Sequence, residues 1–401
     1  MITLSDIVAA SDRIKGRILT TPLVFSPALS RMFNGDIYLK MENLQKTGSF
    51  KIRGAMNLIK ACQEKIPSSG VVAASAGNHA QGVALAARQA GVPATIVMPV
   101  GSSISKQEAT RNYGGNVILE GRSVSDSLAY AKQLARDGRM FIHPFDDPLV
   151  MAGQGTIALE ILASLPEVNR VVVPVGGGGL IAGMAVALRA MKPDVTITGV
   201  QAEVCPSAAA ALQKGAVVSV PGGTSIADGI AVRQTGKATF AIIHDQVDEI
   251  TVVREEDIAA AILLLMERKK IVAEGAGAVA LAALMGRVVN IQPGEKTVLL
   301  ISGGNLDSPL LGRIIRKGLI QSGRIMRINV MLEDIPGALA CLLNLIADNN
   351  ANVLHIHHDR SRRDFPVNVT AVELELETRG EDHIATIKQA LDQAGYALVF
   401  C

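Results

Sequence analysis

The sequence has no tryptophan and few other aromatic residues, with 8 phenylalanines and 4 tyrosines in 401 residues. Proteins that bind single-stranded nucleic acid stack bases on aromatic side chains, and this chain offers few such platforms. Its charge is also nearly balanced, with 39 lysines and arginines against 37 acidic residues and a net charge of +2. A broad basic surface is therefore not expected, and we expect no nucleic-acid partner.

Cysteine is scarce, and the few cysteines lie far apart. They form no C-x-x-C pair and no spacing typical of metal ligands. We therefore expect reduced thiols, with neither a disulfide framework nor a metal site. The four are Cys62, Cys205, Cys341 and Cys401.

No hydrophobic run is suited to crossing a membrane. The longest uncharged stretch, residues 171–188, contains Pro174 and four consecutive glycines, which would interrupt a spanning helix. The N-terminus lacks the basic and then apolar layout of a signal peptide. We expect a soluble, cytoplasmic protein with no membrane partner.

Apolar residues make up 49% of the chain, and residues 36–324 alternate short β-rich runs with helical stretches. This alternation predicts an α/β fold with parallel sheets covered by helices on both faces. Its length exceeds one sheet, so we expect two parallel-sheet subdomains with a ligand crevice between them. We assign residues 1–324 to this domain and roughly 50–150 to its smaller subdomain. The predicted strands are 37–41, 70–74, 94–98, 116–119, 170–175, 196–201, 249–253 and 297–302, and the predicted helices include 51–62, 79–89, 123–136, 179–191, 255–268 and 277–285.

The pattern changes near Arg324. From there the sequence predicts a strand, a helix, two strands, a helix and a last strand, which is the ferredoxin-like β-α-β-β-α-β order. We therefore expect a separate C-terminal domain over residues 325–401, joined to the first by a helix over 308–322. Its predicted elements are 325–333, 338–349, 352–359, 365–378, 382–393 and 396–400.

Four consecutive glycines, Gly176, Gly177, Gly178 and Gly179, follow the apolar strand 170–175 and precede Leu180 at the start of a predicted helix. Such a loop lets successive backbone N–H groups approach an anion at a helix N-terminus, which predicts a phosphate site.

The same glycines allow a second interpretation. Gly177-x-Gly179-x-x-Ala182 also fits the loose dinucleotide fingerprint, with Glu203 placed to hold a ribose hydroxyl. A nicotinamide-dependent oxidoreductase is therefore an alternative function.

Polar residues follow three other predicted strands. Lys51 stands in the first turn of a helix, where the positive potential lowers its pKa and favours a nucleophile or base, although a surface lysine beside Arg53 is the alternative. The turn Ser75–His79 can cap a helix or bind a carboxylate. Ser302–Asn305 ends a strand in the same way. Four such strand ends facing one crevice predict a single site.

These motifs resemble the fold-type II pyridoxal-phosphate enzymes and, within them, the threonine dehydratases (threonine ammonia-lyases). The resemblance covers residues 4 to about 322 and is carried by residues 46–55 (KTGSFKIRGA), 75–82 (SAGNHAQG), 176–180 (GGGGL) and 302–305 (SGGN). It implies that pyridoxal 5'-phosphate is the cofactor and that threonine is converted to 2-oxobutanoate and ammonia. Serine, as a secondary substrate, would give pyruvate.

The resemblance also implies a role for each motif residue. Lys51 would carry the covalent link to the cofactor and, once free, act as the base at Cα. Gly176 to Leu180 would hold the cofactor phosphate, Asn78 would face the pyridine 3-oxygen, and Ser302 would face the ring nitrogen. The Ser75–His79 turn, with Ser75, Gly77, Asn78 and His79, would bind the substrate carboxylate.

Two departures from related serine racemases matter. Those enzymes have a second serine after the one at Ser75, where this chain has Ala76, so racemisation should be minor. They also bind a divalent ion through a glutamate and an aspartate six residues later, where this chain has Glu203 and Ala209. We therefore expect no metal. His355, His357 and His358 are interpreted as a solvated or interface strand face.

Residues 325–401 resemble an ACT regulatory domain, in which residues 334–337 (DIPG) match the ligand-binding turn. The resemblance implies an allosteric site at Asp334 and Gly337 for an aliphatic amino acid such as isoleucine or valine, in a homotetramer. Such dehydratases serve both threonine catabolism and isoleucine biosynthesis. A third interpretation stays open: an inert amino-acid-binding regulatory protein.

Overall fold

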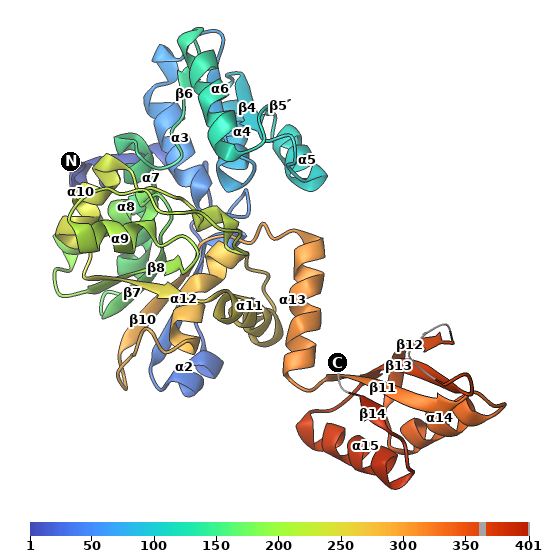
Figure 1. Ribbon diagram of the computed structural model, residues 1–401. Helices are drawn as coiled ribbons and strands as arrows, with labels where there is room; N and C mark the ends of the chain where they lie inside the picture. The colour runs from blue at the N-terminus through green and yellow to red at the C-terminus, as the bar shows by residue number, and fades with distance from the viewer. Residues whose placement is uncertain (361–365, 400–401) are drawn as a thin grey trace. The chain divides into compact units, whose positions relative to one another are not determined.

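The computed structural model describes residues 1–360 and 366–399 of the chain. It divides into two compact units, residues 1–310 and 311–401, which are described separately. The division falls inside α13 (Ser308–Gln321), the helix predicted to join the two domains, and most of α13 belongs to the second unit. Figure 1 shows the elements of each unit.

The larger sheet of the first unit has six strands in the order β1-β2-β10-β7-β8-β9. Every neighbouring pair is parallel except β1 with β2, which is antiparallel. The predicted parallel sheet is confirmed, and β1 is an edge strand that the sequence pattern did not indicate. The bounds are β1 Leu23–Phe25, β2 Asp36–Met41, β7 Arg170–Pro174, β8 Thr196–Ala202, β9 Glu249–Val253 and β10 Lys296–Ile301.

The smaller sheet has four strands in the order β5-β4-β3-β6, all parallel. They are β3 Val71–Ala74, β4 Ala94–Met98, β5 Asn116–Leu119 and β6 Met140–Phe141. Two parallel-sheet subdomains within one unit are what the strand–helix alternation predicted.

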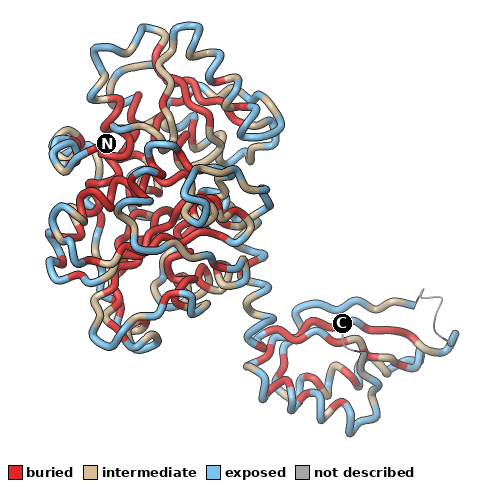
Figure 2. Tube along the Cα trace, turned by 60° about the vertical axis from the view of Figure 1, so that its left-hand side comes forward, coloured by how far each residue is buried: buried red, intermediate tan, exposed pale blue. Residues whose placement is uncertain are grey.

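Helices surround both sheets. The helices of the first unit are α1 Leu4–Ile14, α2 Pro27–Phe33, α3 Lys51–Ala61, α4 Asn78–Ala90, α5 Ile104–Asn112, α6 Val124–Arg136, α7 Pro148–Ser164, α8 Gly179–Met191, α9 Ser207–Lys214, α10 Lys237–Gln246, α11 Glu255–Leu264 and α12 Gly275–Met285, with a short 3-10 turn η3 at Asp228–Ile230. A π-helical turn, Leu265–Lys269, ends α11 earlier than predicted. In Figure 2 the central strands form the buried interior of this unit. Val171, Val172 and Val173 of β7 are fully buried, as expected for a strand covered on both faces.

A buried ion cluster anchors α3 to its surroundings. The Arg53 side chain is 0% exposed; its Nε donates to Glu42 Oε2 (2.8 Å) and its Nη1 to Glu160 Oε1 (2.7 Å). Lys40 Nζ donates to the other Glu160 oxygen at 2.5 Å. Burial alone would raise the pKa of Glu42, but the charge and hydrogen bonds of Arg53 outweigh it and the pKa is lowered. Arg53, the neighbour named in the surface alternative for Lys51, is thus itself part of the buried interior.

The second unit has the predicted β-α-β-β-α-β order, with an antiparallel sheet in the order β12-β13-β11-β14. Apolar side chains of both helices, including Leu342, Ile346 and Leu391, pack on one face of the sheet. Phe365 and Phe400, at the ends of two predicted strands, lie outside the described residues. The elements are β11 Ile325–Glu333, α14 Ala338–Asp348, β12 Asn352–Asp359, β13 Val369–Glu377, α15 Glu381–Gln393 and β14 Leu398–Val399.

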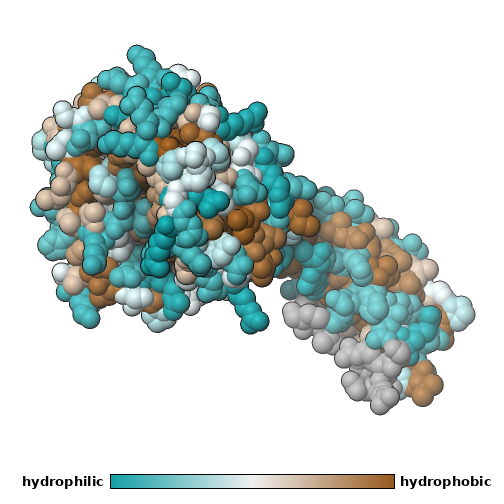
Figure 3. All heavy atoms as spheres, turned by 90° about the horizontal axis from the view of Figure 1, so that it is seen from above, coloured by the Kyte–Doolittle hydropathy of each residue, from teal (hydrophilic) through white to brown (hydrophobic). Residues whose placement is uncertain are grey.

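Within residues 1–360 and 366–399, no helix is both long and apolar enough to cross a membrane. The face of the chain seen in Figure 3 mixes hydrophilic and hydrophobic residues, with the hydrophobic areas separated by hydrophilic ones.

Candidate active site

The segments that follow β2, β3 and β10 come together in the first unit. Ser49 forms an isolated β-bridge with Gly303, and the Phe50 N–H donates to the Ser302 carbonyl at 3.1 Å. Asn305 Nδ2 donates to Asn78 Oδ1 at 2.5 Å. Three of the four predicted strand ends are thus joined by direct hydrogen bonds, as expected for the carboxyl ends of parallel strands.

Lys51 lies among these segments as the first residue of α3. Its Nζ donates to the Pro144 carbonyl at 3.2 Å. Burial lowers the pKa of Lys51 to about 8, although the nearby Glu274 carboxylate opposes this shift. A larger share of this amine is therefore neutral near physiological pH than for an ordinary lysine, which suits a nucleophile or a base.

The glycine loop lies beside Pro144 and Phe145, the segment whose Pro144 carbonyl accepts the hydrogen bond from Lys51. The ring of Phe145, which follows Pro144, lies so close to Gly177 that a Cβ there would be 2.4 Å from it. Gly178 has φ +96°, a left-handed conformation that favours glycine, and α8 begins at Gly179.

The backbone N–H groups of this loop are available to an anion. Within the described residues, none of the N–H groups of Gly176, Gly177 and Gly178 donates to a protein acceptor. The Gly177 carbonyl is held by Thr239 Oγ1 at 2.7 Å, so the loop is fixed from its carbonyl side. Buried N–H groups without a protein acceptor at a helix N-terminus are suited to a phosphate.

Two side chains of the turn after β3, Ser75 and His79, contact backbone groups of the protein. Ser75 Oγ accepts from the Gly77 N–H at 3.1 Å, and Asn78 begins α4. The His79 side chain is buried, with Nε2 3.1 Å from the Ile142 carbonyl. Burial, together with the charge of Lys51, lowers the pKa of His79 to about 3, so the ring is neutral. Of the predicted substrate ligands, His79 therefore has only its backbone N–H to offer.

Ser302 is 1% exposed and lies at the end of β10. Its Oγ donates to the Ala276 carbonyl at 3.3 Å. A serine hydroxyl is uncharged near neutral pH, which is the property predicted for the residue at a cofactor's ring nitrogen.

Glu274 is a site residue that the sequence analysis missed. It is 5% exposed, and its Oε1 accepts from Asn78 Nδ2 at 2.6 Å. Because Glu274 stands directly before the first residue of α12, its only sequence signal is an acidic residue ahead of a helix, which usually indicates a simple cap. No cap hydrogen bond is formed by its side chain.

A group of ion pairs that the sequence did not indicate links the two subdomains. Lys106 of α5 pairs with Asp228 of η3 (2.9 Å) and with Asp307 (3.5 Å). Ser103 and Ser105 also donate to Asp307 Oδ1, at 3.3 and 3.2 Å. The small sheet and the large sheet are therefore tied together beside Glu274 by charged contacts.

Within the described residues, no group of three or more His, Cys, Asp or Glu side chains is placed to hold a metal ion. The described residues do fit pyridoxal phosphate. A half-buried lysine with a lowered pKa, a glycine loop whose N–H groups have no protein acceptor and a neutral serine suit its aldehyde, phosphate and ring nitrogen respectively.

Comparison with known proteins supports this fit. The family described as "Pyridoxal-phosphate dependent enzyme" matches residues 14–303. An L-threonine ammonia-lyase of Thermotoga maritima is 51% identical over 99% of this chain and 98% of its own length. A catabolic L-threonine dehydratase of Escherichia coli is 43% identical over 78% of this chain and 96% of its own.

Solved structures agree. The processed form of threonine deaminase isoform 2 from Solanum lycopersicum is 36% identical with a TM-score of 0.73, covering 78% of this chain and 86% of its own. A maize serine racemase is 34% identical with a TM-score of 0.75, covering 80% of this chain and 98% of its own. These matches favour the phosphate interpretation of the glycine loop over the dinucleotide one. The chain belongs to the family of pyridoxal-phosphate-dependent enzymes.

Proposed function

We propose that this enzyme is a threonine ammonia-lyase, which eliminates water from L-threonine to give an enamine that water then hydrolyses to 2-oxobutanoate and ammonia, with L-serine giving pyruvate as a secondary reaction. The observation that carries the proposal is the half-buried Lys51 amine, with its pKa lowered to about 8, among the segments that follow β2, β3 and β10. Relatives named for this reaction, at 43–51% identity, support the choice of substrate.

Each part of the site then has a task. When bound, pyridoxal phosphate accepts the electrons released at the substrate's Cα. The N–H groups of Gly176 to Leu180 would hold its phosphate. Lys51 would hold the cofactor covalently through Nζ, and the same amine, when free, would take the proton from Cα.

The remaining residues orient the substrate and limit side reactions. The backbone of the Ser75–His79 turn binds the substrate carboxylate, which places Cα beside the Lys51 amine. Ser302 would present an uncharged hydroxyl to the ring nitrogen, which would keep the ring a weaker electron sink than a carboxylate partner would and favour prompt loss of the β-hydroxyl. Ala76 offers no second base on the opposite face, so racemisation stays minor.

The direct test is turnover of both amino acids. With cofactor supplied, we expect 2-oxobutanoate from threonine, and a higher kcat/KM for threonine than for serine. A large excess for serine would contradict the choice of substrate, and the absence of any oxo acid would contradict the elimination reaction.

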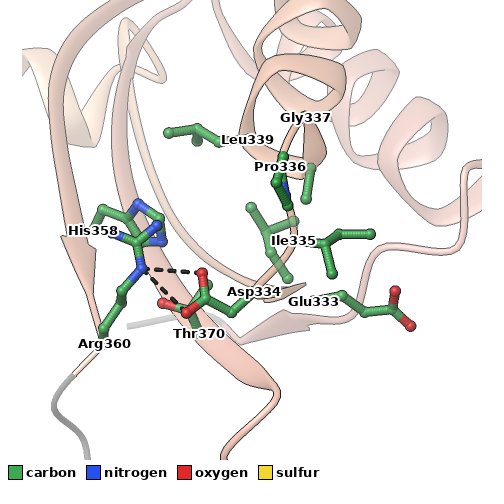
Figure 4. A pocket seen from close by; sticks show the side chains of 11 residues that line it. Glu333, Asp334, Ile335, Pro336, Gly337, Leu339, His358, Arg360 and Thr370 are labelled. Carbon is green, nitrogen blue, oxygen red and sulfur yellow. Dashed lines mark hydrogen bonds and ion pairs between the residues drawn. The ribbon is translucent and has the colours of Figure 1, made fainter.

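For the second unit we propose a regulatory amino-acid site. Figure 4 shows a pocket between the turn that precedes α14 and the end of β12. Its volume is about 460 Å³, and its lining includes Asp334, Ile335, Gly337, His358 and Arg360. A free amino acid suits these groups, because Arg360 and the N-terminus of α14 attract a carboxylate and Asp334 attracts an amine.

Two details of the pocket support a ligand. Arg360 Nε donates to Asp334 Oδ1 at 3.0 Å. A cation for the carboxylate of an amino acid and an anion for its amine therefore lie next to each other. His358 Nε2 is buried and has no hydrogen-bond partner in the described part of the chain. Ile335 and Leu339 offer apolar contacts, which favour isoleucine or valine.

Regulation through this pocket predicts separable effects. In a homotetramer, the effector must bind one quaternary arrangement more tightly than another in order to change activity. We expect Asp334→Ala and a chain truncated after Gly323 to lose the response to isoleucine and valine, while basal turnover of threonine remains. Asp348→Ala, at an exposed residue of the same unit, is the control. A truncated enzyme with an unchanged response, or a full-length enzyme that responds to no amino acid, would contradict the regulatory proposal.

A further inference from the structure

Glu274 is a buried carboxylate to which the mechanism above gives no task. Its backbone N–H donates to the Gly303 carbonyl at 3.0 Å, which fixes the residue beside the Ser302–Asn305 segment. Its side chain reaches across to α4, where Oε1 accepts from Asn78 Nδ2 at 2.6 Å. Burying a carboxylate costs free energy unless hydrogen bonds or opposite charges compensate for the lost water. A buried glutamate is therefore expected to have a function.

The Asn78 amide is held at both ends. Its Oδ1 accepts from Asn305 Nδ2 at 2.5 Å, and Asn305 Nδ2 also donates to the Thr47 carbonyl at 2.9 Å. An ionised carboxylate only accepts hydrogen bonds, so Glu274 requires the NH2 end of Asn78 to face it. The second N–H of that NH2 group is then left for another acceptor.

Charged groups from three elements face Glu274. They are Lys51 at the start of α3, Asp228 of η3 and Lys106 of α5. Burial, followed by the charge of Asp228, raises the pKa of Glu274 to about 7, although the Asn78 hydrogen bond and Lys106 oppose the shift. Glu274 therefore changes charge near neutral pH.

We propose that Glu274 is a positioning residue, which in its ionised form fixes the Asn78 amide so that one N–H remains directed to the bound cofactor. This rests on the proposed function only for the identity of the cofactor and substrate. When Glu274 is protonated, it no longer requires an N–H of Asn78 to face it, and the Asn305 hydrogen bond to Asn78 Oδ1 alone holds the amide. The Asn78 amide is thus held at both ends above pH 7, and its NH2 end is held less firmly as the pH falls through about 7.

The test compares three variants of the full-length holoenzyme. Glu274→Gln keeps the shape of the side chain but cannot ionise, and Glu274→Ala removes the contact. Glu249→Gln, at a half-exposed glutamate on β9 in the same unit, is the matched control. The first readout is the visible absorbance of the bound cofactor titrated between pH 5.5 and 9 (about two units around the expected transition) without substrate. The second is kcat for threonine over the same range.

We expect the wild type and Glu249→Gln to show a transition near pH 7 in both readouts. Glu274→Gln should lose it, and Glu274→Ala should lower kcat by about 10- to 100-fold with a smaller change in KM. A transition that persists in Glu274→Gln, or an unchanged kcat in Glu274→Ala, would overturn the proposal. Because the absorbance titration uses no substrate, it tests Glu274 even if threonine proves to be the wrong substrate.

Discussion

Replacing Lys51 with alanine should abolish turnover of threonine, with a loss on the order of 10³-fold or more in kcat. The proposal gives this amine two tasks, the covalent link to the cofactor and the removal of the Cα proton, and no other lysine hydrogen-bonds to the Pro144 carbonyl in the described residues. The fold should persist, because Lys51 makes one hydrogen bond, to a backbone carbonyl. Initial rates of 2-oxobutanoate formation measure the effect, and circular dichroism measures the fold.

The matched control is Lys60→Ala, which removes a lysine from the same helix. Lys60 Nζ donates to Gln63 Oε1 at the surface, away from the site residues. We expect its activity to stay close to that of the wild type. If Lys51→Ala kept more than a small fraction of wild-type activity, another residue would have to act as the base, and the assignment of Lys51 would be wrong.

Replacing Arg53 with methionine should lower the free energy of unfolding by about 3–5 kcal/mol. The change leaves Glu42, which is fully buried, without its main partner, and an uncompensated buried carboxylate is costly. Chemical denaturation at neutral pH measures the loss, and loss of activity should follow because Arg53 lies two residues from Lys51.

The pH dependence of stability provides a second check on this cluster. The pKa of Glu42 is lowered in the folded chain, so its pairing with Arg53 stabilises the fold above the ordinary glutamate pKa. This stabilisation is lost as the pH falls through the lowered value.

The control for Arg53→Met is Arg254→Met. Arg254 pairs with Asp257 while 64% exposed, and such a pair contributes about 0–1 kcal/mol. If Arg53→Met and Arg254→Met lowered the free energy of unfolding equally, the stability of the Arg53 cluster would not depend on its burial.

The elements predicted from sequence were those with a clear pattern at their ends. β7 was predicted closely because an apolar run meets four glycines, and α8 was predicted with its observed bounds. α7 was missed although it is 17 residues long. It packs against α1, α3 and α8, so it is buried on several sides and shows no single apolar stripe.

Within the site, local motifs identified the residues that lie at strand ends, but not those brought in from elsewhere. Lys51, Asn78 and Ser302 belong to short polar motifs that follow strands. Glu274 reaches Asn78 across 196 residues of chain, and no local spacing indicates such a contact. Arg53 shows the same limit, since its burial depends on Glu160, which lies in the missed helix α7.

Borohydride reduction tests most directly whether Lys51 carries the cofactor. The purified full-length protein would be loaded with pyridoxal phosphate, reduced with sodium borohydride to make the lysine–cofactor link permanent, digested and mapped by mass spectrometry. We expect one phosphopyridoxyl adduct, on the peptide that contains Lys51, and none on that peptide in Lys51→Ala. An adduct on a different lysine, or a protein that forms no adduct with cofactor in excess, would contradict the assignment of Lys51.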